Sequence, residues 1–259
     1  MKASAANGVK NPMHILICND DGYSAQGIKA LTSVMERFGR VTVVAPEYNH
    51  SGASNSLTLN EPLTVTEIDE RTFAVSGTPS DCIHVAMTGL LSEKPDLIVS
   101  GINGGANMGD DTLYSGTVAA AMEGYIFGVD SIAFSQIERG WKELPAAAQA
   151  ASTVVERFLK NKNSEKPVLL NVNIPCLPSS DLKGIAATRL GRRFSADPLV
   201  KTVNPRGMTV YWLGKAGRPA DAAEGTDFWA VAHGFVSVTP LAIDLTSHEE
   251  VASAAQWMA

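Results

Sequence analysis

The 259-residue sequence predicts an α/β fold in which helices flank a mostly parallel sheet. Short continuous apolar runs, such as residues 15–18, are typical of strands buried on both faces of a parallel sheet. These runs alternate with segments whose apolar residues recur at helical spacing, as βαβ units require. From about Pro175 the alternation gives way to short strand candidates in loops rich in Gly, Pro and Asp, so a different architecture is expected there.

The alternating part of the chain predicts its elements in a definite order. Strands are expected at residues 15–18, 41–45, 96–99, 131–135 and 168–174, with a hairpin at 63–68 and 72–75. Helices are expected at residues 26–38, 77–91, 114–127 and 145–159. Gly39 is expected to stop the first helix, because glycine tolerates the left-handed conformation that commonly follows a helix.

The C-terminal part predicts an arm on the main domain. Further strands are expected at residues 186–190, 209–213 and 236–240, and a terminal helix at 249–257. We interpret residues 13–259 as a single domain whose arm begins at about residue 180, and we expect its exposed strands to pair with another subunit. Residues 1–12 are small and polar, and they predict a disordered leader or a remnant of cloning.

Composition excludes several classes of function. A net charge of −6 and a pI near 5.4 give no support for binding to a nucleic acid polymer. No apolar stretch approaches the roughly 20 residues that span a bilayer, so no membrane partner is expected. The three cysteines have no C-x-x-C spacing and argue against a disulfide framework and a zinc site, so a cytoplasmic location is expected.

The most informative local feature is a pair of acidic residues, Asp20 and Asp21, directly after the first apolar run. This position is the carboxyl end of a predicted buried strand, where open α/β sheets place their ligand sites. Adjacent carboxylates repel each other unless a cation lies between them, and Mg²⁺, Mn²⁺ and Ca²⁺ prefer oxygen ligands. Asp-Asp-Gly is also a common turn sequence, and one aspartate could cap the following helix.

Loops after two further predicted strands belong to the same edge of the sheet. One offers Ser51, with Ser54 and Asn55 as neighbours, and the other offers Asn103 and Asn107. A hydroxyl and an amide oxygen from these loops, with the two carboxylates, make an all-oxygen set suited to a hard divalent cation. Read alone, Ser51 and Asn55 are ordinary loop residues, and Asn103 could adopt a left-handed turn conformation among glycines. A second acidic pair, Asp110 and Asp111, lies beyond the glycine-rich loop and is interpreted as a structural turn or cap.

The start of the helix at residues 114–127 predicts an anion site. Ser115, Gly116 and Thr117 combine hydroxyl groups with free backbone N–H groups and the positive end of a helix dipole. Ser115 could equally serve only as an ordinary N-cap. Neither G-x-x-x-x-G-K-[ST] nor G-x-G-x-x-G after the first strand occurs, so a P-loop or a dinucleotide site is poorly supported.

Five motifs in order resemble the SurE family of stationary-phase survival proteins. They are Asn19-Asp20-Asp21-Gly22, the stretches at residues 51–56, 77–82 and 100–107, and the stretch at 114–123; the likeness continues at 234–241. The resemblance implies a Rossmann-like fold and a C-terminal arm exchanged between subunits in homodimers or homotetramers. It implies that Asp20, Asp21, Ser51 and Asn103 bind the metal, and that Asn107 and residues 115–117 form a phosphate pocket.

The resemblance also implies an activity: metal-dependent hydrolysis of nucleoside 5′-monophosphates, with 3′-monophosphates as further substrates. One divalent cation per subunit is expected, Mg²⁺ or Mn²⁺, with Ca²⁺ able to replace it in crystals. Asp20 and Asp21 are the expected catalytic residues, acting with a metal-activated water. Three alternatives stay open: attack by Asp20 as a covalent nucleophile, hydrolysis of short polyphosphate, and nucleotide or phosphate binding without turnover.

Overall fold

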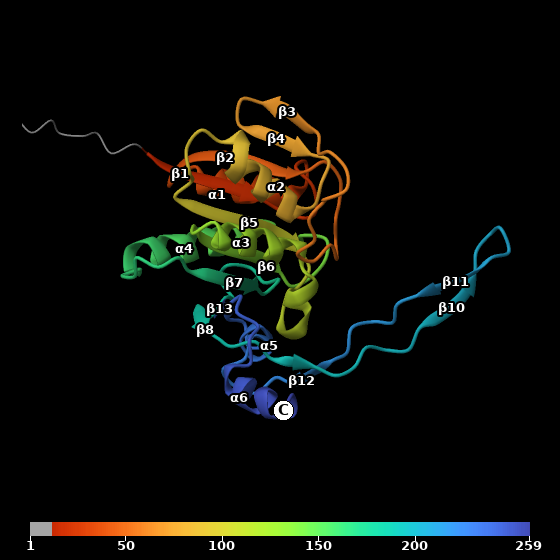
Figure 1. Cartoon of the computed structure of the whole chain (residues 1–259). Helices are drawn as coiled ribbons and strands as arrows, with labels where there is room; N and C mark the ends of the chain where they lie inside the picture. The colour runs from red at the N-terminus through yellow and green to blue at the C-terminus, as the bar shows by residue number, and fades with distance from the viewer. Residues whose placement is uncertain (1–11) are drawn as a thin grey trace, which may run out of the picture.

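The computed structural model describes residues 12–259 and shows a central nine-stranded sheet between helices (Figure 1). The leader expected at residues 1–12 lies, apart from Pro12, outside the described residues. The strands of the sheet are β1 (Met13–Cys18), β2 (Gly39–Pro46), β3 (Val65–Asp69), β4 (Thr72–Val75), β5 (Leu97–Gly104), β6 (Asp130–Gln136), β7 (Leu169–Ile174), β8 (Ile185–Ala187) and β13 (Val236–Pro240). The helices are α1 (Gln26–Met35), α2 (Pro79–Val85), α3 (Gly116–Ile126), α4 (Leu144–Asn161), α5 (Asp227–Ala232) and α6 (Val251–Trp257).

The sheet confirms the predicted α/β architecture. Its strand order is β3-β4-β2-β1-β5-β6-β7-β13-β8, and the pairs from β4 to β7 are all parallel. Only the β3–β4 and β7–β13 pairs are antiparallel. The central strands β1, β5 and β6 are almost wholly buried, which agrees with their continuous apolar runs.

Two predicted boundaries were wrong. Helix α1 ends at Met35 rather than at residue 38, and Gly39 opens β2 instead of stopping the helix. Strand β5 continues to Gly104, through residues that were interpreted as a loop. A Cβ at Gly101 would lie 2.2 Å from the carbonyl oxygen of Phe134, so glycine lets β5 stay against β6 where their register shifts.

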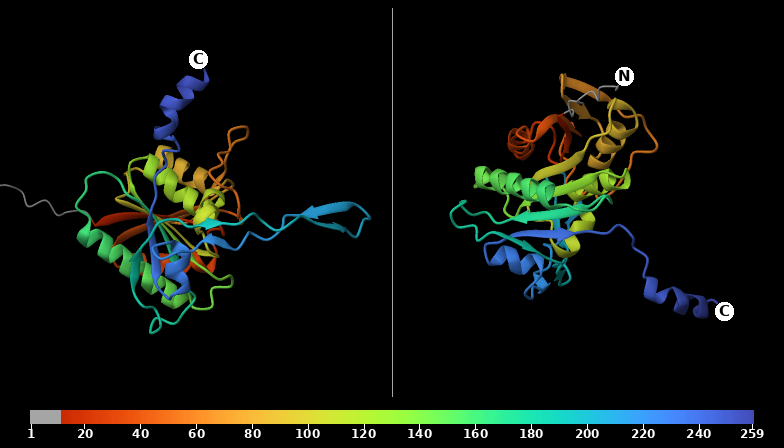
Figure 2. Two further views of the ribbon diagram at one scale, coloured as in Figure 1. Left: turned by 90° about the horizontal axis from the view of Figure 1, so that it is seen from below. Right: turned by 90° about the vertical axis from the view of Figure 1, so that its left-hand side faces the viewer.

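The helices form two layers, with α1 and α4 packed together on one face and α2 and α3 on the other (Figure 2). Strands β5, β6 and β7 lie side by side in the sheet in their order along the chain. Helix α3 connects β5 to β6 and α4 connects β6 to β7, but the two helices lie on opposite faces of the sheet. The two crossovers therefore have opposite hands, although parallel crossovers are right-handed in nearly all proteins. As a result, the loop from β6 to α4 crosses the carboxyl edge of the sheet on the α1 side.

The C-terminal region leaves the body as an arm. Strands β10 (Val200–Val203) and β11 (Thr209–Trp212) form a hairpin that projects away from the sheet (Figures 1 and 2). Its apolar side chains are largely exposed, with Trp212 66% and Val200 57% accessible. The strand expected at residues 209–213 is thus confirmed, whereas β10 was missed. The pairing of the arm with another subunit stays a prediction.

Two sets of contacts fix the base of the arm to the body. The base consists of β9 (Arg192–Arg193) paired with β12 (Pro219–Asp221). Arg193 Nε donates to Asp111 Oδ2 at 2.8 Å, and Arg192 Nε lies 2.8 Å from Asp110 Oδ1. This second acidic pair therefore has a structural role, but it acts through ion pairs to the arm rather than as the predicted cap.

Asp227, the first residue of α5, makes the second contact at this joint. Its side chain is fully buried and accepts three backbone hydrogen bonds. Oδ2 accepts from Gly109 N at 2.7 Å, and Oδ1 accepts from Gly191 N at 2.9 Å and from Phe228 N at 2.8 Å. One carboxylate thus joins the segment after the glycine-rich loop, the start of the arm and α5.

No helix within residues 12–259 is both long enough and apolar enough to cross a membrane.

Candidate active site

The first acidic pair lies at the carboxyl end of β1, as the sequence predicts. The side chain of Asp20 is buried, with 4% of its surface exposed. Its carbonyl oxygen accepts from the backbone N–H of His50 at 2.8 Å, which ties the loop after β2 to the end of β1. The Ser51 loop is therefore held next to the acidic pair by the backbone itself.

The N-terminus of α3 packs against the Asp20 carboxylate. The Thr117 hydroxyl, which is fully buried, donates to Asp20 Oδ1. A Cβ at Gly116 would lie 2.9 Å from the Asp20 Cβ, so only glycine allows this approach without displacement. The structure thus places Gly116 and Thr117 against Asp20 rather than among the residues that line the cavity, and the Thr117 hydroxyl orients Asp20 instead of facing a phosphate.

Asn49 connects Asp21 with Ser51. Its Nδ2 donates to Asp21 Oδ1 at 3.2 Å, and its Oδ1 accepts from the backbone N–H of Ser51 at 2.9 Å. Sequence reasoning missed this residue. The signal was available, because an Asn two residues before a loop residue commonly forms an Asx-turn with that residue's N–H.

The two asparagines after β5 are fixed in different ways. Asn103 Nδ2 donates to Gly105 O at 2.8 Å, which leaves the Asn103 Oδ1 available as a ligand. Asn107 is 7% exposed; its Nδ2 donates to Ser135 Oγ at 2.8 Å, and its backbone N–H donates to Asn173 Oδ1 at 2.9 Å. Polar residues of β6 and β7 thus hold Asn107 in place.

Ser115 is the N-cap of α3 and also lines the cavity. Its Oγ accepts from the backbone N–H of Val118 at 3.0 Å, so its own hydroxyl hydrogen remains free to donate. The capping role and the predicted anion-binding role are therefore compatible. A helix N-terminus with a free hydroxyl donor is suited to a phosphoryl oxygen.

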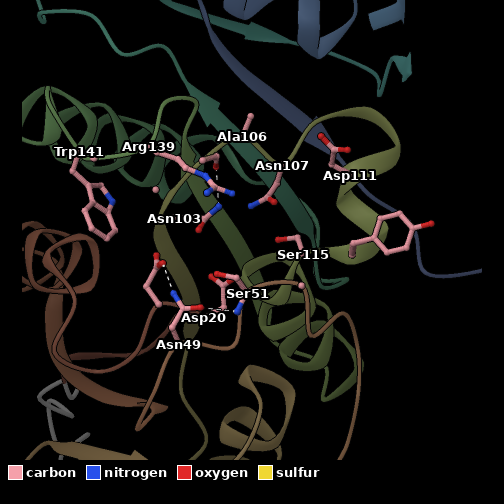
Figure 3. Close-up of a pocket in the computed structure, with 16 residues that line it drawn as sticks. Asp20, Asn49, Ser51, Asn103, Ala106, Asn107, Asp111, Ser115, Arg139 and Trp141 are labelled. Carbon is pink, nitrogen blue, oxygen red and sulfur yellow. Dashed lines mark hydrogen bonds between the residues drawn. The ribbon is translucent and has the colours of Figure 1, made fainter. Parts of the chain in front are cut away.

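These elements surround a cavity of about 550 Å³ at the carboxyl edge of the sheet (Figure 3). Its lining comprises Asp20, Asp21, Asn49, Ser51, Gly52, Asn103, Gly104, Gly105, Ala106, Asn107, Asp111, Tyr114, Ser115, Arg139, Gly140 and Trp141. The four predicted metal ligands all belong to it, as do Asn107 and Ser115. Arg139 is the only lysine or arginine in this lining, and together with Trp141 it comes from the β6–α4 loop that sequence reasoning did not connect with the site.

The donor set fits a hard divalent cation. Two carboxylates, one hydroxyl and one amide oxygen meet without a sulfur or imidazole ligand, which is the chemistry of Mg²⁺, Mn²⁺ or Ca²⁺ rather than zinc. Asp21 Oδ2 is buried and has no hydrogen-bond partner among residues 12–259. A buried carboxylate oxygen without a partner is costly, and a cation at this point would satisfy it.

Burial shifts both carboxylates toward the protonated form, and for Asp21 the charge of Asp20 adds to this shift. Burial raises the pKa of Asp20 above its usual range, and the hydrogen bond from Thr117 opposes this shift. Burial, and next the charge of the neighbouring Asp20, raise the pKa of Asp21 to about 6. In the metal-free protein, ionisation of the pair therefore opposes folding.

This shift predicts a pH dependence of stability in EDTA. The folded-state pKa of Asp21 exceeds the ordinary value of 3.8. The contribution of Asp21 to the free energy of unfolding is therefore fully present below about pH 4 and is lost as the pH rises through about 6. Relative to Asp21→Asn, the wild type should lose about 1–2 kcal/mol of unfolding free energy across this range, allowing for partial exposure of the group. Urea unfolding of both proteins from pH 4 to 7.5 measures this difference; a difference that does not change with pH would contradict the prediction.

Comparison with known proteins identifies the family of the chain. A model of the family described as "Survival protein SurE" matches residues 15–197, which include every predicted metal and phosphate residue. Among solved structures, a SurE protein from Aquifex aeolicus is 43% identical, and its superposition gives a TM-score of 0.83. The match covers 95% of this chain and 100% of that chain.

Proposed function

Because this chain belongs to the SurE family, a family of phosphatases and nucleotidases, we propose that it is a metal-dependent phosphomonoesterase. Its substrates are nucleoside 5′-monophosphates, with 3′-monophosphates also accepted, and its products are the nucleoside and phosphate. One juxtaposition carries this proposal. The unpartnered Asp21 oxygen and the free hydroxyl hydrogen of Ser115 lie in the same cavity, so cation and anion sites are neighbours.

One group of residues in the cavity would bind the cation. Asp20 and Asp21, with Ser51 and Asn103, would hold the cation, and Thr117 keeps the Asp20 carboxylate oriented toward it. A bound Mg²⁺ or Mn²⁺ would neutralise charge on the phosphoryl group and lower the pKa of a water molecule. The acidic pair can also orient that water for attack on phosphorus.

The remaining polar groups would hold the phosphoryl oxygens. The Ser115 hydroxyl would donate from one side of the cavity, with Asn107 beside it. Arg139 supplies the only cationic side chain of the lining and offsets part of the charge of the substrate. Donors that are already in place stabilise the additional charge of the transition state without reorganisation.

Phosphate release from a panel of nucleoside 5′- and 3′-monophosphates, with Mg²⁺, Mn²⁺ or EDTA, tests the proposal. We expect release that requires the cation and that is greatest for 5′-monophosphates. Release from short polyphosphate in preference to nucleotides would identify a polyphosphatase. Nucleotide binding by folded protein without release under any metal would leave a binding module. A phospho-aspartate trapped during turnover would replace the water mechanism with attack by Asp20.

We also propose that the arm joins subunits into a homodimer or homotetramer in the cytoplasm. The exposed apolar hairpin, in which Val200 pairs with Trp212, supports association of subunits. The three free cysteines support the cytoplasmic location. The double variant Val200→Lys, Trp212→Ser should lower the mass measured by sedimentation velocity, because it removes apolar surface that association would bury. The control Lys201→Ser, on the other face of the hairpin, should leave the mass unchanged. A folded, active wild-type monomer would contradict this proposal.

A further inference from the structure

The indole of Trp141 is fixed by a hydrogen bond and by close packing at one side of the cavity. Its Nε1 donates to the carbonyl oxygen of Ile102 at 3.2 Å, next to the predicted ligand Asn103. The ring packs on Gly104, where an added Cβ would lie only 3.0 Å from its Cε2, and beside Gly27 of α1. The side chain is half-buried and lines the cavity, so part of its apolar surface is open to the cavity.

The backbone that carries this indole is itself unusual. Trp141 has a φ of +47° and follows Gly140 with a φ of +93°. A bulky residue in the left-handed region is rare and costs free energy, and such residues gather at ligand sites. The unusual hand of the β6–α4–β7 crossover explains how the loop comes to lie over Gly104 rather than on the α3 side.

Trp141 stands opposite the phosphate-binding side of the cavity. Figure 3 shows Ser115 on one side and Trp141 on the other, with Asn103 between them. A phosphoryl group held by the cation ligands and the N-terminus of α3 would therefore direct its ester substituent either toward Trp141 or toward Tyr114. Tyr114 is 67% exposed, so it is less suited than the anchored indole to act as a rigid surface.

We propose that Trp141 is the platform on which the nucleobase of the substrate stacks, which makes it a specificity-determining residue. This inference rests on the proposed phosphomonoesterase function. Every nucleobase has a π-face, so stacking accounts for selection of nucleotides over simple phosphate esters without selecting one base. In this arrangement the β6–α4 loop binds the nucleoside, and the residues after β1, β2 and β5 bind the phosphate.

A pair of substrates that differ only in the base tests the platform. AMP and ribose 5-phosphate share the phosphomonoester and the ribose, so the ratio of their kcat/KM values isolates the contribution of the base. Trp141→Leu should lower kcat/KM for AMP about tenfold, within the range measured for base–aromatic stacking, and change that for ribose 5-phosphate less than about twofold. Trp141→Phe should retain most of the selectivity, because it keeps an aromatic face.

Two results would overturn the platform. An equal loss for both substrates in Trp141→Leu would show that the indole only supports Asn103 and Gly104. A loss of selectivity in Tyr114→Leu, with none in Trp141→Leu, would place the base at the opposite side of the cavity. The melting temperature of each variant in EDTA shows whether it remains folded.

A binding measurement separates failure of this inference from failure of the proposed function. In protein loaded with Ca²⁺, and at concentrations at which calorimetry shows both compounds bound, AMP should quench tryptophan fluorescence more strongly than ribose 5-phosphate does, and Trp141→Phe should remove this difference. The titration does not depend on turnover, so it decides the role of Trp141 even for a protein that releases no phosphate. Equal quenching by both compounds, or quenching by AMP that persists in Trp141→Phe, would rule the platform out.

Discussion

Replacing Asp20 with asparagine should reduce cation-dependent phosphate release by about 10³-fold, because a bound cation contributes several kcal/mol to transition-state stabilisation. The substitution keeps the shape of the side chain and an amide oxygen that can still accept from Thr117, but it removes the charge that would hold the cation. It also removes a buried carboxylate whose pKa is raised by burial. The metal-free variant should therefore be at least as stable as the metal-free wild type near neutral pH.

The second Asp-Asp pair provides the matched control. Asp110 is bound to Arg192 and to the backbone N–H of Arg193, and it does not line the cavity. Asp110→Asn should retain phosphate release within about threefold of the wild type, as expected for a polar substitution outside the reacting groups. Steady-state rates and calorimetric binding of Mn²⁺ to both variants measure the contrast. Full activity in folded Asp20→Asn would remove the metal role assigned to this residue.

Replacing Asp227 with alanine should lower the free energy of unfolding by about 3–5 kcal/mol. The substitution leaves the backbone N–H groups of Gly109, Gly191 and Phe228 without their acceptor in a fully buried place, and each unpaired donor is costly. The effect should appear as a lower midpoint in urea unfolding. The body of the sheet should retain its far-ultraviolet circular dichroism under native conditions.

Asp227→Asn gives a graded comparison. Its amide keeps one oxygen acceptor but presents an NH₂ group to one of the N–H donors, so an intermediate loss of about 1–3 kcal/mol is expected. An alanine variant as stable as the wild type would show that the three hydrogen bonds are replaced by water.

The parallel sheet, and the meeting of Asp20, Ser51 and Asn103 at one cavity, could be predicted because their signals are local. Runs such as residues 15–18 are apolar at every position and short, which is typical of a strand buried on both faces. Once parallel strands are assigned, their following loops must share one edge, so Asp20, Ser51 and Asn103 come together without any knowledge of distance.

The rest of the site could not be predicted because it depends on tertiary placement. Trp141 and Arg139 reach the cavity only because α4 lies on the α1 face, whereas the usual right-handed crossover would have put their loop on the other side. The Thr117 hydroxyl, expected to meet a phosphate, faces Asp20 because Gly116 allows α3 to approach closely. Strand β10 is short and exposed, so no burial pattern marks it.

The position of β13 has a consequence for synthesis on the ribosome. This strand lies between β7 and β8, yet it emerges roughly 65 residues after β7 is complete. At ~5–20 residues per second, β7 presents an unpaired edge for several seconds, and β8 has no neighbour in the sheet during that time. Nascent chains that stall within the arm therefore expose a strand edge competent to pair with other chains, and this interval is when chaperone protection has the greatest value.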